Sequence, residues 1–166
     1  MNRAPTRRSF VLAASAGVAA LPLLGACGSG PANARDNFPV SKSEAEWRKR
    51  LTKSEYHVLR EAGTERPYTS PLNEEKRAGT FVCAGCGNAV YSSKHKYDSG
   101  TGWPSFWQAI DRGAVGTSTD YKIGLPRTEV HCGDCGGHLG HIFGDGPAPT
   151  GKRHCINGLA LDFRPA

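Results

Sequence analysis

The sequence predicts a mainly β fold of the α+β class, with antiparallel strands and short helices packed on one side. After Gly63, short runs rich in aromatic and β-branched residues alternate with clusters of Gly, Pro, Asp and Asn, and no long helical period recurs. Before Gly63, two capping-box patterns introduce short helical segments. Beyond two CxxC units there is no internal repeat, so we expect a single domain at 41–166.

Residues 1–27 have the character of an export signal. A head containing three arginines precedes an apolar run at 11–24 that is too short to span a bilayer. The stretch TRRSFVL resembles a twin-arginine signal, and LGAC resembles a lipobox, in which Cys27 is lipidated. Cleavage after Ala34 is the alternative. We therefore expect export to the periplasm or cell envelope, with lipid anchoring at Cys27 as the favoured outcome.

Residues 28–40 are rich in Gly, Pro, Ala and Asn, which is typical of a flexible linker. The chain carries a formal net charge of +6, and the three arginines before Cys27 account for half of it. In the rest of the chain basic residues are interleaved with acidic ones, which argues against nucleic-acid binding.

Two short helices are expected after the linker. Ser41 with Glu44 and Thr52 with Glu55 both fit the capping box, and Gly63 is a plausible helix stop. The apolar positions that would face the core are Trp47, Leu51, Tyr56, Val58 and Leu59. The strand-like runs that follow are TFVC, NAVYSS, TEVHC, HIFG and GLALDF.

The two CxxC units predict a metal site. Cys83 and Cys86, and Cys132 and Cys135, each resemble a zinc knuckle, and together they supply the four thiolates of a closed structural zinc site. Two disulfides, or a redox CxxC, are the alternative in an exported protein. A redox CxxC normally opens a helix, whereas both units follow strand-like runs, so we favour one structural zinc per chain.

Cys155 has no CxxC partner and is the candidate nucleophile. In a strand, Arg153 and Asn157 leave on the same face as Cys155, while Ile156 points to the core. A guanidinium beside a thiol favours the nucleophilic thiolate, and the Asn157 amide can donate a hydrogen bond to the sulfur or to a substrate oxygen. A small buried hydrophobe is the ordinary alternative for a lone cysteine.

Two further stretches supply candidate site residues. In HLGHIFGDGP, His138 and His141 lie close to Asp145, and a histidine near a carboxylate is a usable proton donor. In GTGWPSFW, Trp103 and Phe106 are the substrate-binding candidates. Trp103 is better placed to wall an exposed pocket, where an indole attracts a methyl–sulfur group, while Phe106 also fits ordinary core packing.

These motifs resemble the B-type methionine sulfoxide reductases. The likeness runs from GTERPYTSPL through CAGC, KYDSGTGWPSFW and RTEVHCGDCGGHLGHIFGDGPAPTG to RHCINGLALDF, covering nearly all of 46–163. The resemblance implies a fold of two small antiparallel sheets, held together by the zinc, with helices outside. It also implies an oxidoreductase that reduces the R epimer of methionine sulfoxide in peptides and proteins, without an organic cofactor.

The resemblance assigns roles to the residues already named. Cys155 attacks the sulfoxide sulfur and becomes a sulfenic acid. His138 or His141, with Asp145 nearby, assists protonation of the departing oxygen, and Trp103 holds the S-methyl group. The residues expected to tune and orient the thiol and the substrate are Arg153 and Asn157.

The chain departs from many family members at two positions. Thr101 stands where these members carry a second, resolving cysteine, and Gly158 stands where many carry serine. With Cys27 acylated or removed and four cysteines on zinc, no thiol is left to form a disulfide with Cys155. We therefore expect an external thiol, carried by a thioredoxin-like partner, to reduce the sulfenic acid.

Two other classes of protein are consistent with parts of the pattern. A zinc-knuckle binding module would not need Cys155 and would present a basic aromatic face, which the charge pattern does not support. A redox sensor or chaperone would lose its metal under mild oxidation. We expect a monomeric enzyme that contacts a membrane only through a lipid anchor at Cys27.

Overall fold

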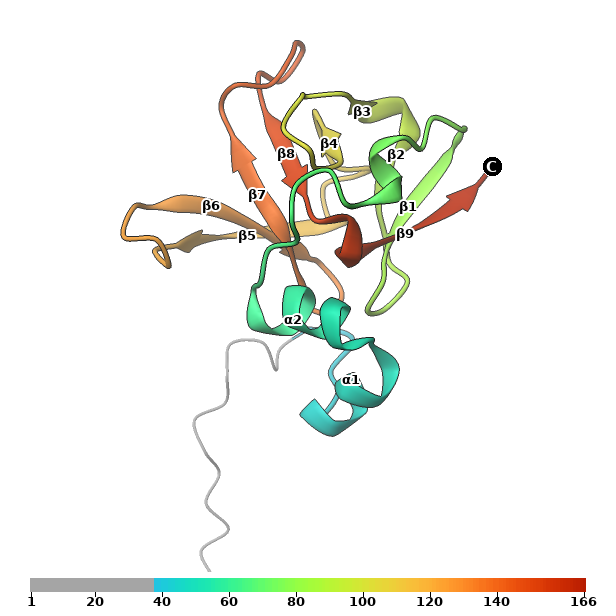
Figure 1. The fold of residues 1–166 in the computed structure, drawn as a ribbon, viewed down its shortest axis with the longest axis vertical. Coiled ribbons are helices and arrows are strands. Elements are labelled where there is room, and N and C mark those ends of the chain that lie inside the picture. Colours follow the sequence, from blue (N-terminus) through green and yellow to red (C-terminus); the bar gives the residue numbers. More distant parts are fainter. Residues whose placement is uncertain (1–37) are drawn as a thin grey trace, which may run out of the picture. The chain divides into compact units, whose positions relative to one another are not determined.

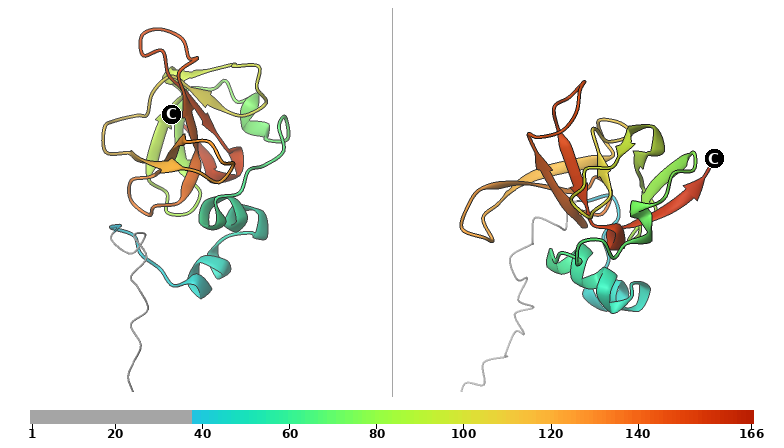
Figure 2. Two further views of the ribbon diagram at one scale, coloured as in Figure 1. Left: turned by 90° about the vertical axis from the view of Figure 1, so that its left-hand side faces the viewer. Right: turned by 45° about the horizontal axis from the view of Figure 1, so that its top comes forward.

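The computed structural model describes residues 38–166, so the predicted export signal, the lipobox and most of the predicted linker lie outside the described residues. The described part is mainly β, with two antiparallel sheets and two short α-helices, as the sequence predicts (Figure 1; Figure 2). No helix in it is long and apolar enough to cross a membrane.

The last residues of the predicted linker already belong to the folded domain. The Val40 N–H donates to the Asp134 carbonyl at 2.8 Å, and the Phe38 ring packs edge-on against His131 with centroids 5.5 Å apart. Composition indicated a linker to residue 40, but these contacts reach partners about ninety residues along the chain, beyond any local pattern.

Helix α1 (Glu44–Arg50) begins two residues later than the pattern indicated. Its N-cap is Ser43, whose hydroxyl accepts the Glu46 N–H, and the Glu46 carboxylate accepts the Ser43 N–H in return. The predicted pair of Ser41 with Glu44 was therefore wrong. The stretch SKSEAE contains the capping box in two registers, and the motif alone does not distinguish them.

Helix α2 (Lys53–Glu61) follows its prediction closely. Thr52 caps it and Glu55 completes the capping box. The helix ends just before Gly63, where Ala62 takes the left-handed conformation with φ 51° as the C-cap. The predicted apolar positions of both helices are buried, namely Trp47, Leu51, Tyr56, Val58 and Leu59.

The smaller sheet has the strand order β2–β1–β9, with both pairs antiparallel. Its strands are β1 (Gly79–Cys83), β2 (Ala89–Ser92) and β9 (Leu161–Pro165). The predicted strand GLALDF is only half strand, because its first residues form the 3₁₀ helix η4 (Gly158–Ala160). The other 3₁₀ helices of the described part are η2 (Pro71–Asn73) and η3 (Ser93–His95).

The larger sheet has the order β3–β4–β8–β7–β6–β5, again fully antiparallel. Its strands are β3 (Lys96–Tyr97), β4 (Ser105–Phe106), β5 (Val115–Asp120), β6 (Arg127–Cys132), β7 (His138–Phe143) and β8 (Arg153–Ile156). Strand β5 was not among the predicted runs. Its sequence VGTSTD has no apolar face, and it lies at the edge of the sheet with half of its residues exposed.

An aromatic cluster joins the two sheets. The Phe106 ring of β4 stacks on Tyr91 of β2 at 4.3 Å, and Phe81 of β1 meets it edge-on at 5.0 Å. All three side chains are fully buried. Phe106 therefore lies in the core and does not line the pocket, so the proposal that it binds substrate is corrected in favour of the packing alternative.

The packing of η4 explains the unusual Gly158. A Cβ at this position would collide with the Ser70 side chain. The Gly158 N–H also donates to the buried Glu65 carboxylate. A protein with a larger residue at position 158 must therefore differ at or near position 70 to make room for it.

We predict that Gly158→Ala lowers the free energy of unfolding by about 1–3 kcal/mol, because the methyl group overpacks this contact. In the background of Ser70→Gly the same substitution should cost much less. Urea denaturation of the two single variants and the double variant measures the coupling. Equal costs in both backgrounds would contradict the assignment of the clash to Ser70.

Candidate active site and metal centre

Four cysteine side chains converge from two turns. Cys83 ends β1 and Cys86 lies in the turn to β2, while Cys132 ends β6 and Cys135 lies in the turn to β7. Their sulfur atoms all lie within 4.8 Å of one another. The Sγ atoms of Cys83 and Cys135 are 3.7 Å apart, and those of Cys86 and Cys132 are 3.5 Å apart. The predicted cluster is therefore formed.

The spacing of the sulfur atoms fits a metal ion. Four sulfurs bonded at about 2.3 Å to one tetrahedral ion stand about 3.8 Å apart, close to the observed separations. A disulfide would bring two sulfurs to about 2.05 Å. No cysteine in residues 38–166 forms a disulfide, so the alternative of two disulfides is not what the structure contains. The four cysteines can hold a metal ion.

Glycines make both CxxC turns possible. Gly87 has φ +82° and donates its N–H to the Cys83 carbonyl at 2.7 Å. Gly136 has φ +64° and donates to the Cys132 carbonyl at 3.0 Å. Both positions need the left-handed region, which glycine enters without the steric cost of a side chain.

The helices and one asparagine are attached to this cluster. The Arg50 Nε donates to the Gly85 carbonyl, and the Arg60 guanidinium donates to the Cys135 carbonyl at 3.0 Å. The Asn88 amide donates to the Cys132 sulfur at 3.4 Å. No sequence pattern indicated these contacts, since each is made by a single polar residue distant in the chain.

Cys155 lies in β8, between β4 and β7. Ser105 is its pairing partner on β4 and His141 its partner on β7. The side chain is partly buried. This pairing places the thiol between the Thr101 loop that precedes β4 and the histidines of β7, two stretches that are far apart in sequence.

Arg153 forms an ion pair with Asp145. Its guanidinium donates two hydrogen bonds of 2.9 Å to the Asp145 carboxylate, and it stacks over the Phe143 ring at 4.5 Å. Asp145 was predicted to assist a histidine. That prediction was wrong, because the loop after β7 turns Asp145 back towards β8.

Burial controls the ionisation of Cys155. It raises the pKa of the Cys155 thiol above its ordinary value, while the hydrogen bond from Thr101 and the charge of Arg153 lower that pKa by smaller amounts. The predicted effect of Arg153 therefore has the right sign, but burial exceeds it. In the free protein Cys155 is a protonated thiol near neutral pH.

A chain of hydroxyl groups approaches the Cys155 sulfur. The Thr101 hydroxyl lies 3.9 Å from Sγ and 2.8 Å from the Ser99 hydroxyl, which is itself 2.7 Å from the Ser105 hydroxyl. In residues 38–166 every other cysteine belongs to the four-sulfur cluster. The group next to the Cys155 sulfur at position 101 is therefore a hydroxyl and not a second thiol.

A β-bulge brings the two histidines together. Residues three apart in a regular strand point to opposite faces, but the register between β6 and β7 shifts at Leu139. As a result the rings of His138 and His141 lie 5.3 Å apart. The His138 Nε2 is buried and has no hydrogen-bond partner among the described residues.

Each histidine has a carboxylate that the sequence did not indicate. Glu129 accepts from His138 Nδ1 at 2.7 Å, which lowers the pKa of that carboxyl to about 2. Asp120 contacts His141 Nε2 at 2.8 Å and also pairs with Arg127. Burial lowers the pKa of His141, and the Asp120 contact opposes this shift. These partners come from β5 and β6, so strand pairing alone brings them to β7.

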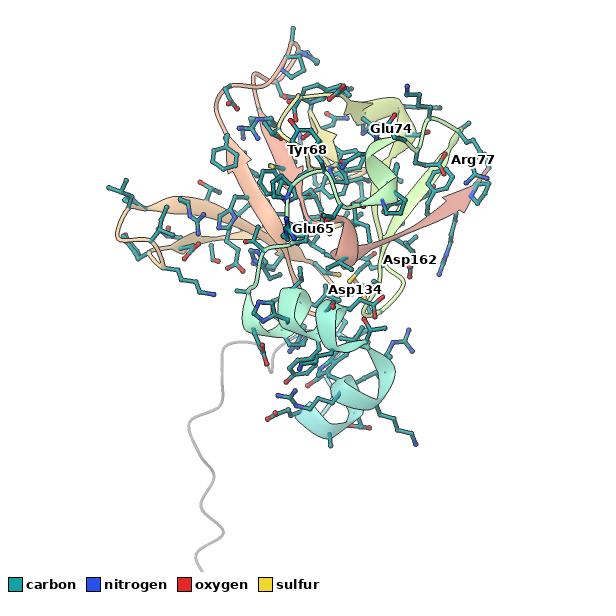
Figure 3. The ribbon with its side chains drawn as sticks, viewed as in Figure 1. Glu65, Tyr68, Glu74, Arg77, Asp134 and Asp162 are labelled. Carbon is teal, nitrogen blue, oxygen red and sulfur yellow. The ribbon has the colours of Figure 1, made fainter. Side chains whose placement is uncertain are left out.

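Asn157 acts in the framework under the site. Its carbonyl oxygen accepts the Glu65 N–H at 3.0 Å, and its amide donates to the Leu139 carbonyl at 3.0 Å. Glu65 lies in the segment after α2 (Figure 3), and its carbonyl accepts the Trp103 indole N–H at 3.2 Å. Of the two predicted partners of the Asn157 amide, the thiol does not accept a hydrogen bond from it, and the substrate oxygen stays a prediction. The residue instead helps position the wall that contains Trp103.

A pocket of about 140 Å³ opens beside the thiol. Trp103, His141 and Cys155 all line it, so the structure brings together a thiol, an imidazole and an indole that the sequence singled out. The remaining residues of the lining are Thr64, Arg127, Gly140, Phe143 and Asn157.

Comparison with known proteins places this arrangement in a family. The SelR domain model matches residues 51–165. A peptide methionine sulfoxide reductase MsrB of Leptospira interrogans is 49% identical over 128 residues, which cover 77% of this chain and 98% of the relative. One from Methanosarcina barkeri is 52% identical over 125 residues, covering 75% of this chain and 88% of the relative.

The chain belongs to the B-type methionine sulfoxide reductases. The resemblance of the motifs to this family is therefore confirmed. A further B-type reductase, from Leifsonia xyli, is 48% identical over 132 residues, with 79% of this chain and 95% of the relative covered. The similarity includes both CxxC turns and β8, the parts that carry the cluster and Cys155.

We predict that the cluster of this B-type reductase holds a metal ion and that removing the ion destabilises the protein strongly. The cluster ties β1 to β6 and, through two arginines, ties both helices to the turns. Cys86→Ser, or treatment with a strong chelator, should lower the thermal midpoint by about 10 °C or more. Metal analysis and thermal scans monitored by circular dichroism test this. Cys155→Ser is the matched control and should keep its metal, whereas an unchanged midpoint for metal-free protein would contradict the prediction.

We also predict that Cys155 ionises above its ordinary range and that Arg153→Gln raises its pKa further. The substitution removes the positive charge that favours the thiolate, while the burial persists. The pH dependence of Cys155 alkylation by iodoacetamide, followed by mass spectrometry, gives both midpoints. A midpoint near neutral pH in the parent, or a lower one in the variant, would show that burial does not govern this thiol.

Proposed function

We propose that this chain reduces the R epimer of methionine sulfoxide in peptides and proteins to methionine, with Cys155 as the nucleophile. The observation that carries the proposal is the position of the Cys155 thiol in a small pocket walled by Trp103 and facing His141. The relatives are named peptide methionine sulfoxide reductases, and the motifs imply the R epimer.

The first step transfers one oxygen atom from the substrate to the enzyme. The Cys155 sulfur, as a thiolate, attacks the sulfoxide sulfur and forms an S–S bond. The protonated oxygen then passes from the substrate sulfur to the Cys155 sulfur, and the S–S bond breaks with its electron pair returning to the substrate sulfur. The products are methionine and the Cys155 sulfenic acid, so the sulfoxide is reduced and the cysteine is oxidised by two electrons. Because the resting thiol is protonated, its proton must leave as the substrate binds.

His141 is the proposed proton donor. It lines the pocket, whereas His138 lies deeper and is 2% exposed. Asp120 holds the His141 ring and stabilises its protonated form, while burial makes that form a stronger acid. Proton transfer to the sulfoxide oxygen makes it a better leaving group. His138, fixed by Glu129, packs against His141 and supports its orientation.

Trp103 is the proposed contact for the S-methyl group. Its indole N–H is used by the Glu65 carbonyl, which fixes the orientation of the ring next to the pocket. Sulfur and methyl groups bind aromatic faces with about 0.3–1.5 kcal/mol, enough to orient a small group.

An external thiol then restores the enzyme. A thiolate attacks the Cys155 sulfenic acid and displaces water, giving a mixed disulfide, and a second thiol releases Cys155 as a thiol while the two external thiols become a disulfide. Thr101 supports this route, because a hydroxyl occupies the position next to the Cys155 sulfur. A thioredoxin-like protein is the proposed donor.

Zinc is the proposed metal of the four-cysteine cluster. Four thiolates in tetrahedral spacing are a closed structural set with no position left for substrate, so the metal would stabilise the fold and take no part in the reaction.

Export by the twin-arginine route, lipidation at Cys27 and a monomeric state also belong to this proposal. The proposals of export and lipidation depend on the sequence of residues 1–40.

The direct test is turnover of a short peptide with one methionine R-sulfoxide, beside its S epimer, with dithiothreitol as reductant. We expect reduction of the R epimer only, and a loss of at least about 1,000-fold in Cys155→Ser. If a folded, metal-loaded sample reduces neither epimer, the enzyme proposal is wrong and a sensor or binding role takes its place.

A further inference from the structure

The connection between β5 and β6 exposes three large apolar side chains. We call residues 121–125 the hairpin tip. In it Tyr121 is 67% exposed, Ile123 59% and Leu125 68%. Only one other large apolar side chain in residues 38–166 is exposed to this degree. Single exposed apolar residues are ordinary, but a group of this kind marks an interaction surface.

The hairpin tip is adjacent to the active site along the chain. Asp120, which precedes it, contacts His141, and Arg127, which follows it closely, lines the pocket. Figure 1 shows the β5–β6 hairpin extending away from the rest of the sheet. Leu125 is two residues from Arg127, so its Cα lies within about 7 Å of the Cα of that pocket residue.

Hydrogen bonds hold the tip against the segment after α2 that contributes Thr64 to the pocket lining. The Lys122 ammonium donates to the Ala62 carbonyl at 3.0 Å, and Ala62 stands two residues before Thr64 of the pocket lining. The Lys122 N–H donates to Asp120, and Gly124, with φ +80°, closes the turn onto the Tyr121 carbonyl. The apolar side chains are thus held on a defined turn.

We propose that the hairpin tip binds apolar residues that flank the oxidised methionine in the substrate polypeptide. This inference rests on the proposed function. An extended chain advances about 3.3–3.6 Å per residue, so residues about two to four positions from the methionine reach the tip while the sulfoxide occupies the pocket. Substrates with Leu, Val or Phe at these positions are therefore preferred to polar ones.

Two features favour a polypeptide over a membrane surface as the partner of the hairpin tip: the tip follows directly from pocket residues in the chain, and the charges around it are not those of a membrane-binding surface. An anionic membrane would be recognised by free basic residues. The two cations at or beside the tip already have partners, because Lys122 donates to the Ala62 carbonyl and Arg127 pairs with Asp120. An apolar peptide segment needs no such cations, and its backbone can extend from the pocket directly onto the tip.

The test uses two short R-sulfoxide peptides and one small substrate. One peptide has Leu and Val around the oxidised methionine, the second has Ser at these positions, and the small substrate is N-acetylmethionine R-sulfoxide amide. The variant carries Tyr121→Ser, Ile123→Ser and Leu125→Ser together. The matched control carries Tyr121→Phe, Ile123→Leu and Leu125→Ile, which keep the apolar surface.

We expect the parent and the matched control to favour the apolar peptide over the Ser peptide by about tenfold in kcat/KM. In the serine variant this preference should disappear, with turnover of the small substrate unchanged. If the parent shows no preference, or if the serine variant keeps it or loses activity equally on all three substrates, the proposal is wrong.

Direct binding measurements test the tip without turnover. Fluorescence anisotropy of labelled peptides, with methionine in place of the sulfoxide, gives the Kd of each peptide. This measurement tests the tip even if the protein does not reduce the small substrate and the proposed function is wrong. We expect the serine variant to bind the apolar peptide more weakly than the parent and the matched control do. Equal Kd values for the parent and the serine variant would overturn the inference.

Flotation with phosphatidylglycerol vesicles and sedimentation velocity distinguish a peptide from a membrane surface or a second copy of the chain. We expect the parent and the serine variant to behave alike in both measurements. Binding to vesicles or self-association that depends on the tip, without a peptide preference, would also overturn the inference.

Discussion

The site depends on the pairing of β8 with β4 on one side and β7 on the other. This pairing sets Cys155 opposite Ser105 and opposite His141, and it also half-buries the thiol. Burial raises the pKa of the Cys155 thiol, which disfavours its thiolate form. Arg153 and the Thr101 hydroxyl reduce this cost without removing it. The strand pairing therefore determines both the position of the Cys155 thiol and its raised pKa.

The four-cysteine cluster and the framework around Glu65 support this arrangement from two sides. The cluster fixes the turn between β6 and β7, and therefore the start of the strand that carries the histidines. Glu65 accepts hydrogen bonds from η4 through Gly158 and from the Trp103 indole, which joins the segment after α2 to the pocket wall. Glu65 contacts Trp103 directly, and the cluster borders the start of β7, so we expect a change in either support to affect stability and activity together.

Much of this architecture could be predicted from the sequence because it is determined by patterns of residues close together in the chain. CxxC spacing predicted the cluster, and alternation around Cys155 predicted the strand. What the sequence could not provide were partners brought in by pairing between strands. The bulge at Leu139, which aligns His138 with His141, has no local signal, and Asp120 comes from a strand without an apolar face. Asp145 is close to the histidines in sequence but pairs with Arg153 instead.

In the proposed reaction Cys155 takes one oxygen atom from the substrate, and no internal thiol resolves the sulfenic acid. The measurement that tests this most directly is a single turnover with excess R-sulfoxide peptide and no reductant. We predict one methionine formed per chain, Cys155 trapped as a sulfenic acid by dimedone, and the four cluster cysteines unmodified. More than one methionine per chain, or a disulfide linking Cys155 to a cluster cysteine, would contradict it.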